Sequence, residues 1–475
     1  MRFLPHTDDD RKAMLATIGV DGMRDLFADI PAEFHREPGS LNLPEALSEA
    51  GIVRKFTEAA ESNRHAGNTR CFLGGGTYHH FVPAVVDYVI SRGEFLTAYT
   101  PYQPEIAQGT LQTLFEFQTM IARLTGMEVS NASMYDAATS VAEAALMARR
   151  VTRKSRIVMA GSVNPRYRAV TANYLSRQDG EYVEVKSKKG AKGKKGTVSL
   201  FRSEESKLSP FLPVPFLLPK LDTVIAALND ETACVIVQYP DFYGSVYDLA
   251  PLRAACDAHQ CLMVVAFSDA TAFALIDPPG AYGADIAIGS GQSLGIPMGF
   301  GGPHLGLFTC KQKYVRKMPG RVCGMTEDLD GKRGFVLTLA TREQHIRREK
   351  ATSNICSNQG LMCTAAATYM TLMGDAGLET VARHSAAALN RLVEGLPEHV
   401  QAASGTHFNE TVLSFANEAA RNCFMDEATG QNIFAGIPLE QLDGTAESRH
   451  LLVATTEMIG EEDVSDYLNA LGAAL

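Results

Sequence analysis

Four segments mix glycine, proline and polar residues as binding loops do, and they are where this sequence could carry chemistry. They span residues 97–109, 131–139, 289–303 and 341–356. In the first, two prolines fix an extended entry into a helix that we expect to begin near Glu105, with Gln108 close behind. Tyr102 and Gln103 would then lie at the amino end of that helix. Such an end attracts an anion such as a substrate carboxylate. A helix cap with core tyrosines is the alternative.

The segment around Ser133 leads into an alanine-rich helix expected from Asp136 to Arg150. Ser133 and the free backbone N–H groups of the first turn could bind a phosphate. The Asp136 carboxylate would repel a phosphate, so simple capping of the helix is at least as good an interpretation.

The segment 341–356 holds His345 and Asn354 within a dense group of basic residues, namely Arg342, Arg347, Arg348 and Lys350. Charges at this density are more often solvated, or part of interface ion pairs, than catalytic. We therefore expect a subunit interface here.

The sequence gives little support for a nucleotide-binding loop or for a metal site. No G-x-x-x-x-G-K-[ST] loop occurs, and no G-x-G-x-x-G joins a strand to a helix with an acidic residue about twenty positions on. His79 and His80 are adjacent, and neighbours on a strand point to opposite faces, so they are poorly placed to share a metal. The nine cysteines contain no C-x-x-C pair, and we expect no metal site.

Composition narrows the class of protein. The chain has 475 residues, 45% hydrophobic and 21% charged, as expected of a soluble globular protein with two or three domains. Its net charge of −10 argues against nucleic acid as the main partner. The sequence predicts neither a signal peptide nor a membrane span, and the scattered cysteines favour the reducing cytoplasm.

The elements that must position these segments form three regions. Residues 1–65 read as a proline-broken helical arm, 66–340 as a large α/β domain and 341–475 as a junction with a small α+β domain. Continuous apolar runs in the large domain predict a mostly parallel sheet, with strands at 156–160, 181–185, 233–238, 261–266, 284–288 and 305–310. A lysine-rich insertion at 186–197 is expected to be exposed and dispensable.

Two runs of the sequence are highly specific for one protein family. Residues 291–297 read Gly-Gln-Ser-Leu-Gly-Ile-Pro, and residues 342–356 read Arg-Glu-Gln-His-Ile-Arg-Arg-Glu-Lys-Ala-Thr-Ser-Asn-Ile-Cys. With the 97–109 and 131–139 segments they resemble the glycine dehydrogenase (decarboxylating) family, the P-protein of the glycine cleavage system. Within it they are similar to subunit 1, the amino-terminal half of the split form. The resemblance covers nearly the full chain, and His79 departs from it because members usually carry Asp there.

The resemblance implies a fold-type I, pyridoxal-phosphate (PLP)-dependent transferase-like α/β architecture. It also implies a reaction. Together with a second subunit, such a protein decarboxylates glycine through PLP and passes the aminomethyl group to the lipoyl arm of the H-protein. A catalytically silent scaffold that stabilises the PLP-bearing partner is the alternative, and a stand-alone PLP decarboxylase is a third interpretation.

The resemblance also gives roles to single residues. Ser133 lies where the family places its phosphate-binding loop, and Asp269 lies where an aspartate pairs the pyridinium nitrogen, although capping of the following turn would also explain it. The position of the Schiff-base lysine falls on Gln292, which cannot form an imine. We therefore expect no catalytic residue and no covalently bound PLP on this chain, the cofactor belonging to the partner subunit.

Overall fold

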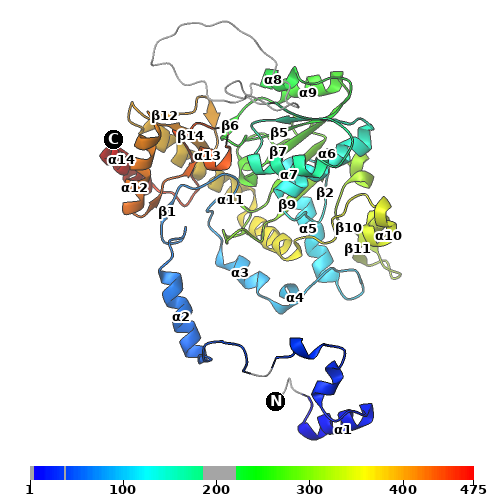
Figure 1. Cartoon of the computed structure of the whole chain (residues 1–475). Helices are drawn as coiled ribbons and strands as arrows, with labels where there is room; N and C mark the ends of the chain where they lie inside the picture. Colours follow the sequence, from blue (N-terminus) through cyan, green and yellow to red (C-terminus); the bar gives the residue numbers. More distant parts are fainter. Residues whose placement is uncertain (1–4, 37–38, 186–220, 445) are drawn as a thin grey trace. The chain divides into compact units, whose positions relative to one another are not determined.

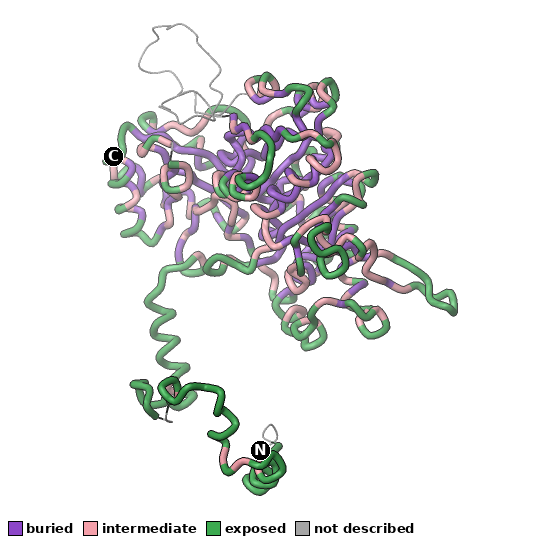
Figure 2. Tube along the Cα trace, turned by 45° about the vertical axis from the view of Figure 1, so that its right-hand side comes forward, coloured by how far each residue is buried: buried purple, intermediate pink, exposed green. Residues whose placement is uncertain are grey.

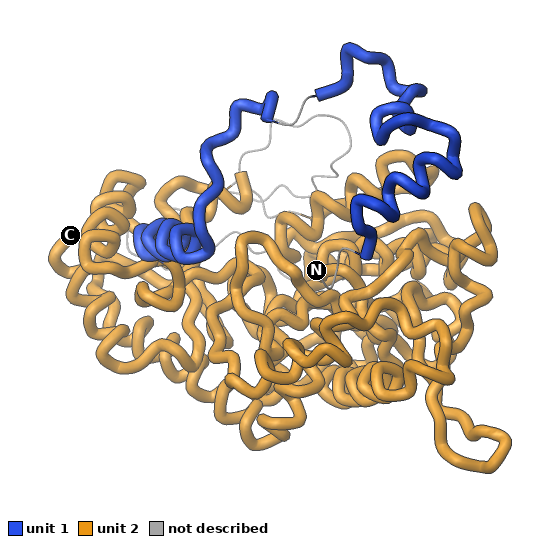
Figure 3. Tube along the Cα trace, turned by 90° about the horizontal axis from the view of Figure 1, so that it is seen from below, with its two compact units in different colours: residues 1–64 blue, residues 65–475 orange. Residues whose placement is uncertain are grey.

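The computed structural model describes residues 5–36, 39–185, 221–444 and 446–475. The insertion expected at 186–197 lies outside these ranges. The chain divides into two compact units, Met1–Arg64 and His65–Leu475 (Figure 3).

The first unit is helical, and its described residues build no core of their own. Its elements are α1 (Asp8–Ile18), two short 3₁₀ helices (Met23–Phe27 and Ala32–Phe34) and α2 (Glu49–Glu61). Thr7 caps α1 in a reciprocal box with Asp10, so the start of this helix is fixed by residues three positions apart. None of its described residues is buried, and large apolar side chains such as Phe34 and Phe56 are more than half exposed.

A seven-stranded sheet organises the second unit, in the order β2-β9-β8-β7-β5-β3-β4 (Figure 1). The strands from β8 to β4 run parallel, whereas β9 is antiparallel to both β8 and β2. All six predicted strands are confirmed to within two residues, and nearly every residue in them is buried, as the uniformly apolar runs require. Their bounds are β2 Val129–Ser130, β3 Arg156–Ala160, β4 Tyr182–Val185, β5 Thr232–Gln238, β7 Leu262–Phe267, β8 Ile286–Ser290 and β9 Gly306–Cys310.

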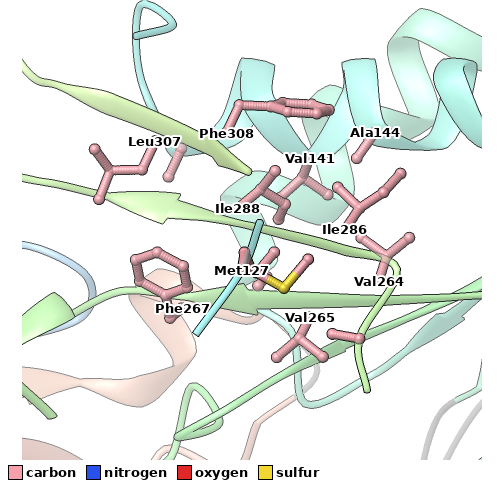
Figure 4. Packing of buried hydrophobic residues seen from close by; sticks show 14 of the residues in the cluster. Met127, Val141, Ala144, Val264, Val265, Phe267, Ile286, Ile288, Leu307 and Phe308 are labelled. Atoms are coloured by element: carbon pink, nitrogen blue, oxygen red, sulfur yellow. The ribbon is translucent and has the colours of Figure 1, made fainter. Parts of the chain in front are cut away.

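Helices cover this sheet and close its core. Figure 4 shows Val141 and Ala144 of α6 beside Ile286, Ile288 and Phe308 of the sheet, and Figure 2 shows the buried interior that results. The helices of this region are α3 Ala84–Ile90, α4 Gly93–Leu96, α5 Gln108–Thr125, α6 Ala137–Thr152, α7 Pro165–Leu175, α8 Leu221–Ile225 and α9 Ala250–Ala258.

The carboxy-terminal part begins with α11 (Gly360–Glu394), which has a non-helical residue at Gly374 and so joins two helical stretches. A four-stranded antiparallel sheet follows, ordered β12-β14-β17-β16. Its elements are β12 Gln401–Ala402, β14 Glu410–Ser414, α12 Glu418–Gly430, β16 Ile437–Pro438, α13 Leu439–Leu442, β17 His450–Ala454 and α14 Glu461–Ala474.

Short pairings complete the unit. An antiparallel hairpin, β10 (Val322–Glu327) with β11 (Arg333–Thr338), precedes a 3₁₀ turn (Ala340–Arg342), α10 (Gln344–Arg347) and a second 3₁₀ turn (Arg348–Lys350). The remaining short pairs are β1 (Arg70–Cys71) with β15 (Ile433–Phe434), and β6 (Ser245–Val246) with β13 (Thr406–His407). Within the described ranges, no helix is long and apolar enough to cross a membrane.

Candidate functional site

A buried polar network lies beyond the carboxyl end of β7, where Asp269 caps the 3₁₀ helix Ala270–Ala274. The Asp269 carboxylate accepts hydrogen bonds from the backbone N–H (2.9 Å) and the hydroxyl (2.7 Å) of Thr271. It also accepts one from Asn409 Nδ2 at 2.9 Å and pairs with His80 Nε2 at 3.1 Å. The network therefore joins the parallel sheet to the carboxy-terminal part of the chain.

His80 is the cation of this network. Its Nδ1 lies 2.7 Å from the Glu457 carboxylate, so the ring bridges two acids, and the side chains of His80 and Asp269 are 2% and 3% exposed. Burial by itself lowers the pKa of His80, but the attraction and hydrogen bonds of Asp269 and Glu457 outweigh it and raise that pKa to about 10. Burial raises the pKa of Asp269, but charge attraction and hydrogen bonding from His80 outweigh it and leave that pKa lowered. An imidazolium thus faces Asp269 where the family resemblance predicted a pyridinium.

Gln292 follows β8 and is 2% exposed. Its Oε1 accepts from the backbone N–H of Tyr78 at 2.9 Å, and its Nε2 donates to the carbonyls of Tyr78 (3.0 Å) and Ile296 (2.8 Å). The side chain therefore holds the segment that contains Tyr78 and His80 against the end of the sheet.

Glu410 fixes the same segment from the other side. Its carboxylate accepts from the N–H of Gly75 at 2.6 Å and from the Tyr78 hydroxyl at 2.9 Å. Burial raises the pKa of Glu410 to about 8, because these two hydrogen bonds offset only part of the cost of burying its charge. Burial likewise raises the pKa of Asp241, beside it, to about 7.

The residues at this place do not fit covalently held PLP. Gln292 stands where the resemblance predicted the lysine, and its amide is occupied by backbone groups. The Asp269 carboxylate is engaged by His80, Asn409 and Thr271. Lys311, the next lysine along the chain, donates to Asp285 at 3.0 Å, at the opposite end of β8. Asp241, Asp269 and Glu410 line a small pocket here whose lining includes no lysine, and we assign no reaction step to it.

A second group of polar residues lies at the start of β10. Arg321 is 4% exposed, and its Nη2 donates to the Tyr102 hydroxyl at 2.7 Å and to the carbonyl of Cys356. The ring of His345 meets that of Tyr102 edge-on, with 5.9 Å between centroids. Two predicted site residues, Tyr102 and His345, are thus brought together around an arginine that the sequence analysis did not single out.

The expected helix start near Glu105 is wrong. The helix α5 begins at Gln108, and residues 103–106 form a turn closed by the Ile106 N–H on the carbonyl of Gln103. Proline at the second position of a turn is favoured, and Pro104 stands there. Gln103 and Glu105 are therefore exposed on a turn and not at a helix end.

The remaining predicted residues are separate from both groups. Gln108 has a tethering role, because its amide donates to the carbonyl of Phe335 and accepts from the N–H of the same residue, both at 2.9 Å. Asn354 is exposed. Ser133 is fully buried and its hydroxyl accepts from the N–H of Gln359, so it is occupied within the chain. Asp136 caps α6 through the N–H of Thr139, as the capping interpretation predicted.

Comparisons with known proteins agree with this fold. The sequence profile described as glycine cleavage system P-protein matches residues 1–471. The chain belongs to this family. A protein of Rhodospirillum rubrum called probable glycine dehydrogenase (decarboxylating) subunit 1 is 45% identical to this P-protein chain, over 100% of both sequences. Its counterpart of the same description from Novosphingobium aromaticivorans is 42% identical, again over 100% of both.

Solved structures extend the likeness. A crystal structure of glycine decarboxylase (P-protein) of the glycine cleavage system, in inhibitor-bound form, matches this P-protein chain with a TM-score of 0.82 and 38% identity, over 100% of both chains. A glutamate decarboxylase of Lactobacillus brevis matches with a TM-score of 0.64 at 13% identity, over 94% of this chain and 96% of the other, which shows the fold alone. The expected fold-type I, PLP-dependent transferase-like α/β class is confirmed.

Sequence reasoning missed His80, Asn409, Glu410, Glu457 and Arg321. The first four lack a local signal, because their partners lie far away along the chain. Arg321 did have a local signal, because a single arginine among apolar residues is either buried with partners or at an interface. The run Gly291–Gly295 also fits the G-x-S-x-G pattern of a nucleophile elbow, yet Ser293 is fully buried and its hydroxyl accepts from the N–H of Ala270.

Proposed function

We propose that this chain is subunit 1 of a two-subunit glycine dehydrogenase (decarboxylating), which decarboxylates glycine and transfers the aminomethyl group to the lipoyl arm of the H-protein. The observation that carries this is the full-length similarity to relatives named subunit 1 of that enzyme. The name subunit 1 implies a second subunit. We propose the cytoplasm as the compartment of this protein. The nine cysteines of the chain are all free in the structure, and thiols stay reduced in the cytoplasm.

The PLP of the assembly is, in this proposal, held covalently by the second subunit. Its support is Gln292, which cannot form an imine and whose amide is bound to the backbone of Tyr78 and Ile296. Borohydride reduction of the assembled enzyme followed by peptide mapping should place the pyridoxyl-lysine on the partner. A pyridoxyl-lysine on this chain would overturn the proposal.

An exposed apolar surface supports association with the partner. Between residues 81 and 106, just before α3, on α3 and α4 and in the loop that follows, seven large side chains are 39% to 84% exposed: Phe81, Val85, Tyr88, Leu96, Tyr99, Tyr102 and Ile106. Apolar side chains gathered at this density commonly mark a protein interface. An obligate subunit interface of this kind buries more than about 2,000 Å² in total.

Glycine-dependent exchange of labelled carbon dioxide into the glycine carboxyl group tests the whole assignment. The chain and its second subunit, co-expressed and supplied with lipoylated H-protein, should catalyse the exchange. Each subunit alone should be inactive. Exchange by this chain alone would indicate a stand-alone decarboxylase instead.

The scaffold alternative is favoured by one observation: a glutamine stands where the resemblance predicts the lysine, and the amide of Gln292 is bound to backbone groups. Tyr102→Phe distinguishes the two functions, because it removes a hydroxyl that binds Arg321 at 2.7 Å while keeping the exposed ring. Tyr99→Phe, three residues away and 84% exposed, is the matched control. If the chain contributes to the active site, only the Tyr102 variant should lose turnover with assembly intact. Unchanged turnover in both would support the scaffold.

A further inference from the structure

Arg321 is buried with part of its hydrogen-bonding capacity unused. Its Nη2 is bound to Tyr102 and to the carbonyl of Cys356, whereas its Nε and Nη1 have no hydrogen-bond acceptor. Buried donors are almost always satisfied, and an ionised group gains most from satisfaction. A guanidinium that is 4% exposed and has two free donors therefore calls for an acceptor from outside the chain.

The charges around Arg321 also favour an acceptor from outside the chain. Glu343 is the nearest carboxylate, but its Oε2 lies 3.7 Å from Arg321 Nε, beyond hydrogen-bond length. The same oxygen is 3.5 Å from Nδ1 of His345, so the two compete for it. Arg342 adds a second guanidinium, whose donors go to carbonyl oxygens, among them those of Leu339 and Gly320. Two guanidinium groups and one carboxylate line the place.

These residues surround a pocket. It is small and open to solvent at its mouth, and it is formed where residues 318–321, Arg342, Glu343 and the segments 352–353 and 355–357 meet. Thr352 and Ser357 bring hydroxyl groups to the lining, and Ile355 and Met318 bring apolar surface. Positive charge and hydroxyl donors beside a low-dielectric wall suit a negatively charged oxygen group.

We propose that this pocket binds a small oxyanion, a carboxylate or a phosphate, on the guanidinium of Arg321. Nε and Nη1 of Arg321 lie on different sides of the planar guanidinium, so each can donate to one oxygen of such a group. The orientation of the guanidinium is fixed, because its Nη2 already donates to Tyr102 and Cys356. The site is separate from the network around Asp269 and does not depend on the reaction assigned to the family.

Cysteine reactivity offers a direct measurement with an internal reference. Cys356 lines the pocket and is exposed, Cys423 in α12 is also exposed, and the other seven cysteines are buried. The full-length chain is alkylated with iodoacetamide, an uncharged reagent, at constant ionic strength set with sodium chloride. Inorganic phosphate is added in one series, acetate in a second and glycine in a third.

We expect phosphate or a carboxylate to slow alkylation of Cys356 at least about threefold in a saturable way, with Cys423 unchanged, and to give a matching one-site isotherm by calorimetry. Stronger protection by phosphate would identify a phosphate group as the natural ligand. Stronger protection by acetate or glycine would identify a carboxylate. If no anion gives protection or a binding heat, Glu343 is the only acidic partner of Arg321 and the proposal fails.

Variants connect the binding to Arg321. Arg321→Met should abolish protection, and Arg321→Lys, which keeps the charge and loses the planar guanidinium, should need several times more anion. Arg383→Met is the matched control, because Arg383 is an exposed arginine of α11 paired with Glu379. The buried cysteines report folding, since they become reactive in a variant that unfolds. Protection that persists unchanged in folded Arg321→Lys and Arg321→Met would also overturn the proposal.

Discussion

Replacing His80 by glutamine should cost this protein several kilocalories per mole of stability, with a characteristic pH dependence. The imidazolium lies between Asp269, at 3.1 Å, and Glu457, at 2.7 Å, with the histidine side chain 2% exposed. A glutamine could donate to one of these carboxylates but carries no charge. Both acids would remain in the interior without their cation.

The size of the effect follows from the raised pKa of His80, about 10 in the folded chain against an ordinary value of 6.5. At about 1.4 kcal/mol per pH unit, this sets an upper bound of ~5 kcal/mol. Removing one member of a buried charge cluster costs about 3–5 kcal/mol, which is consistent. Because the pKa is raised on folding, the contribution of His80 is complete below pH 6.5 and is lost as the pH rises through 10.

The stability contributions of the two carboxylates depend on pH in the opposite direction to that of His80. The pKa values of Asp269 and Glu457 are lowered on folding, so their contributions are present above their unfolded pKa values and are lost as the pH falls through the folded ones. The difference between wild type and variant should therefore be largest between about pH 5 and 6.5 and should shrink towards pH 10.

Urea unfolding followed by far-ultraviolet circular dichroism at pH 6, 8 and 10 measures this difference. His79→Gln is the matched control, because His79 is the adjacent histidine but only half-buried, and should cost less than about 1 kcal/mol. Equal losses in the two variants, or a His80→Gln loss that stays the same from pH 6 to pH 10, would refute the reasoning.

Three further outcomes follow from particular contacts. Gln292→Lys should show no aldimine absorption with added PLP and should lose about 1–3 kcal/mol, since lysine cannot accept from the N–H of Tyr78; an aldimine band would contradict the conclusion that the residues here do not fit covalently held PLP. Gly244→Ala should lose more than about 3 kcal/mol, because φ is +88° and a Cβ would lie 1.7 Å from the Glu410 carbonyl oxygen, whereas Gly430→Ala, in open space, should be near neutral by the same urea titration. Deleting residues 1–30 should weaken the complex with the second subunit in sedimentation but leave the urea midpoint unchanged, because no described residue among them is buried; an undiminished complex would remove the arm from the interface.

Much of the architecture follows from the sequence because the relevant signals are local. The strands at 156–160 and 233–238 are continuous apolar runs, and a strand buried on both faces needs nothing more. The start of α1 at Thr7 and the cap of α6 at Asp136 are also local, since a capping side chain binds an N–H only three residues away. The start of α5 was misplaced because the turn at Pro104 competes with a helix start and the sequence carries both signals.

The sequence by itself also determined that a glutamine stands at position 292, where the family resemblance predicts the Schiff-base lysine. No folding can turn this glutamine into an imine-forming amine. Only the tertiary structure decided what occupies the place instead. His80 meets Asp269 across 189 positions and Glu457 across 377, and Arg321 meets Tyr102 across 219. No periodicity or spacing predicts such pairs, because their energy arises when distant segments are brought together away from water, and it is the packing of the whole chain that brings them there.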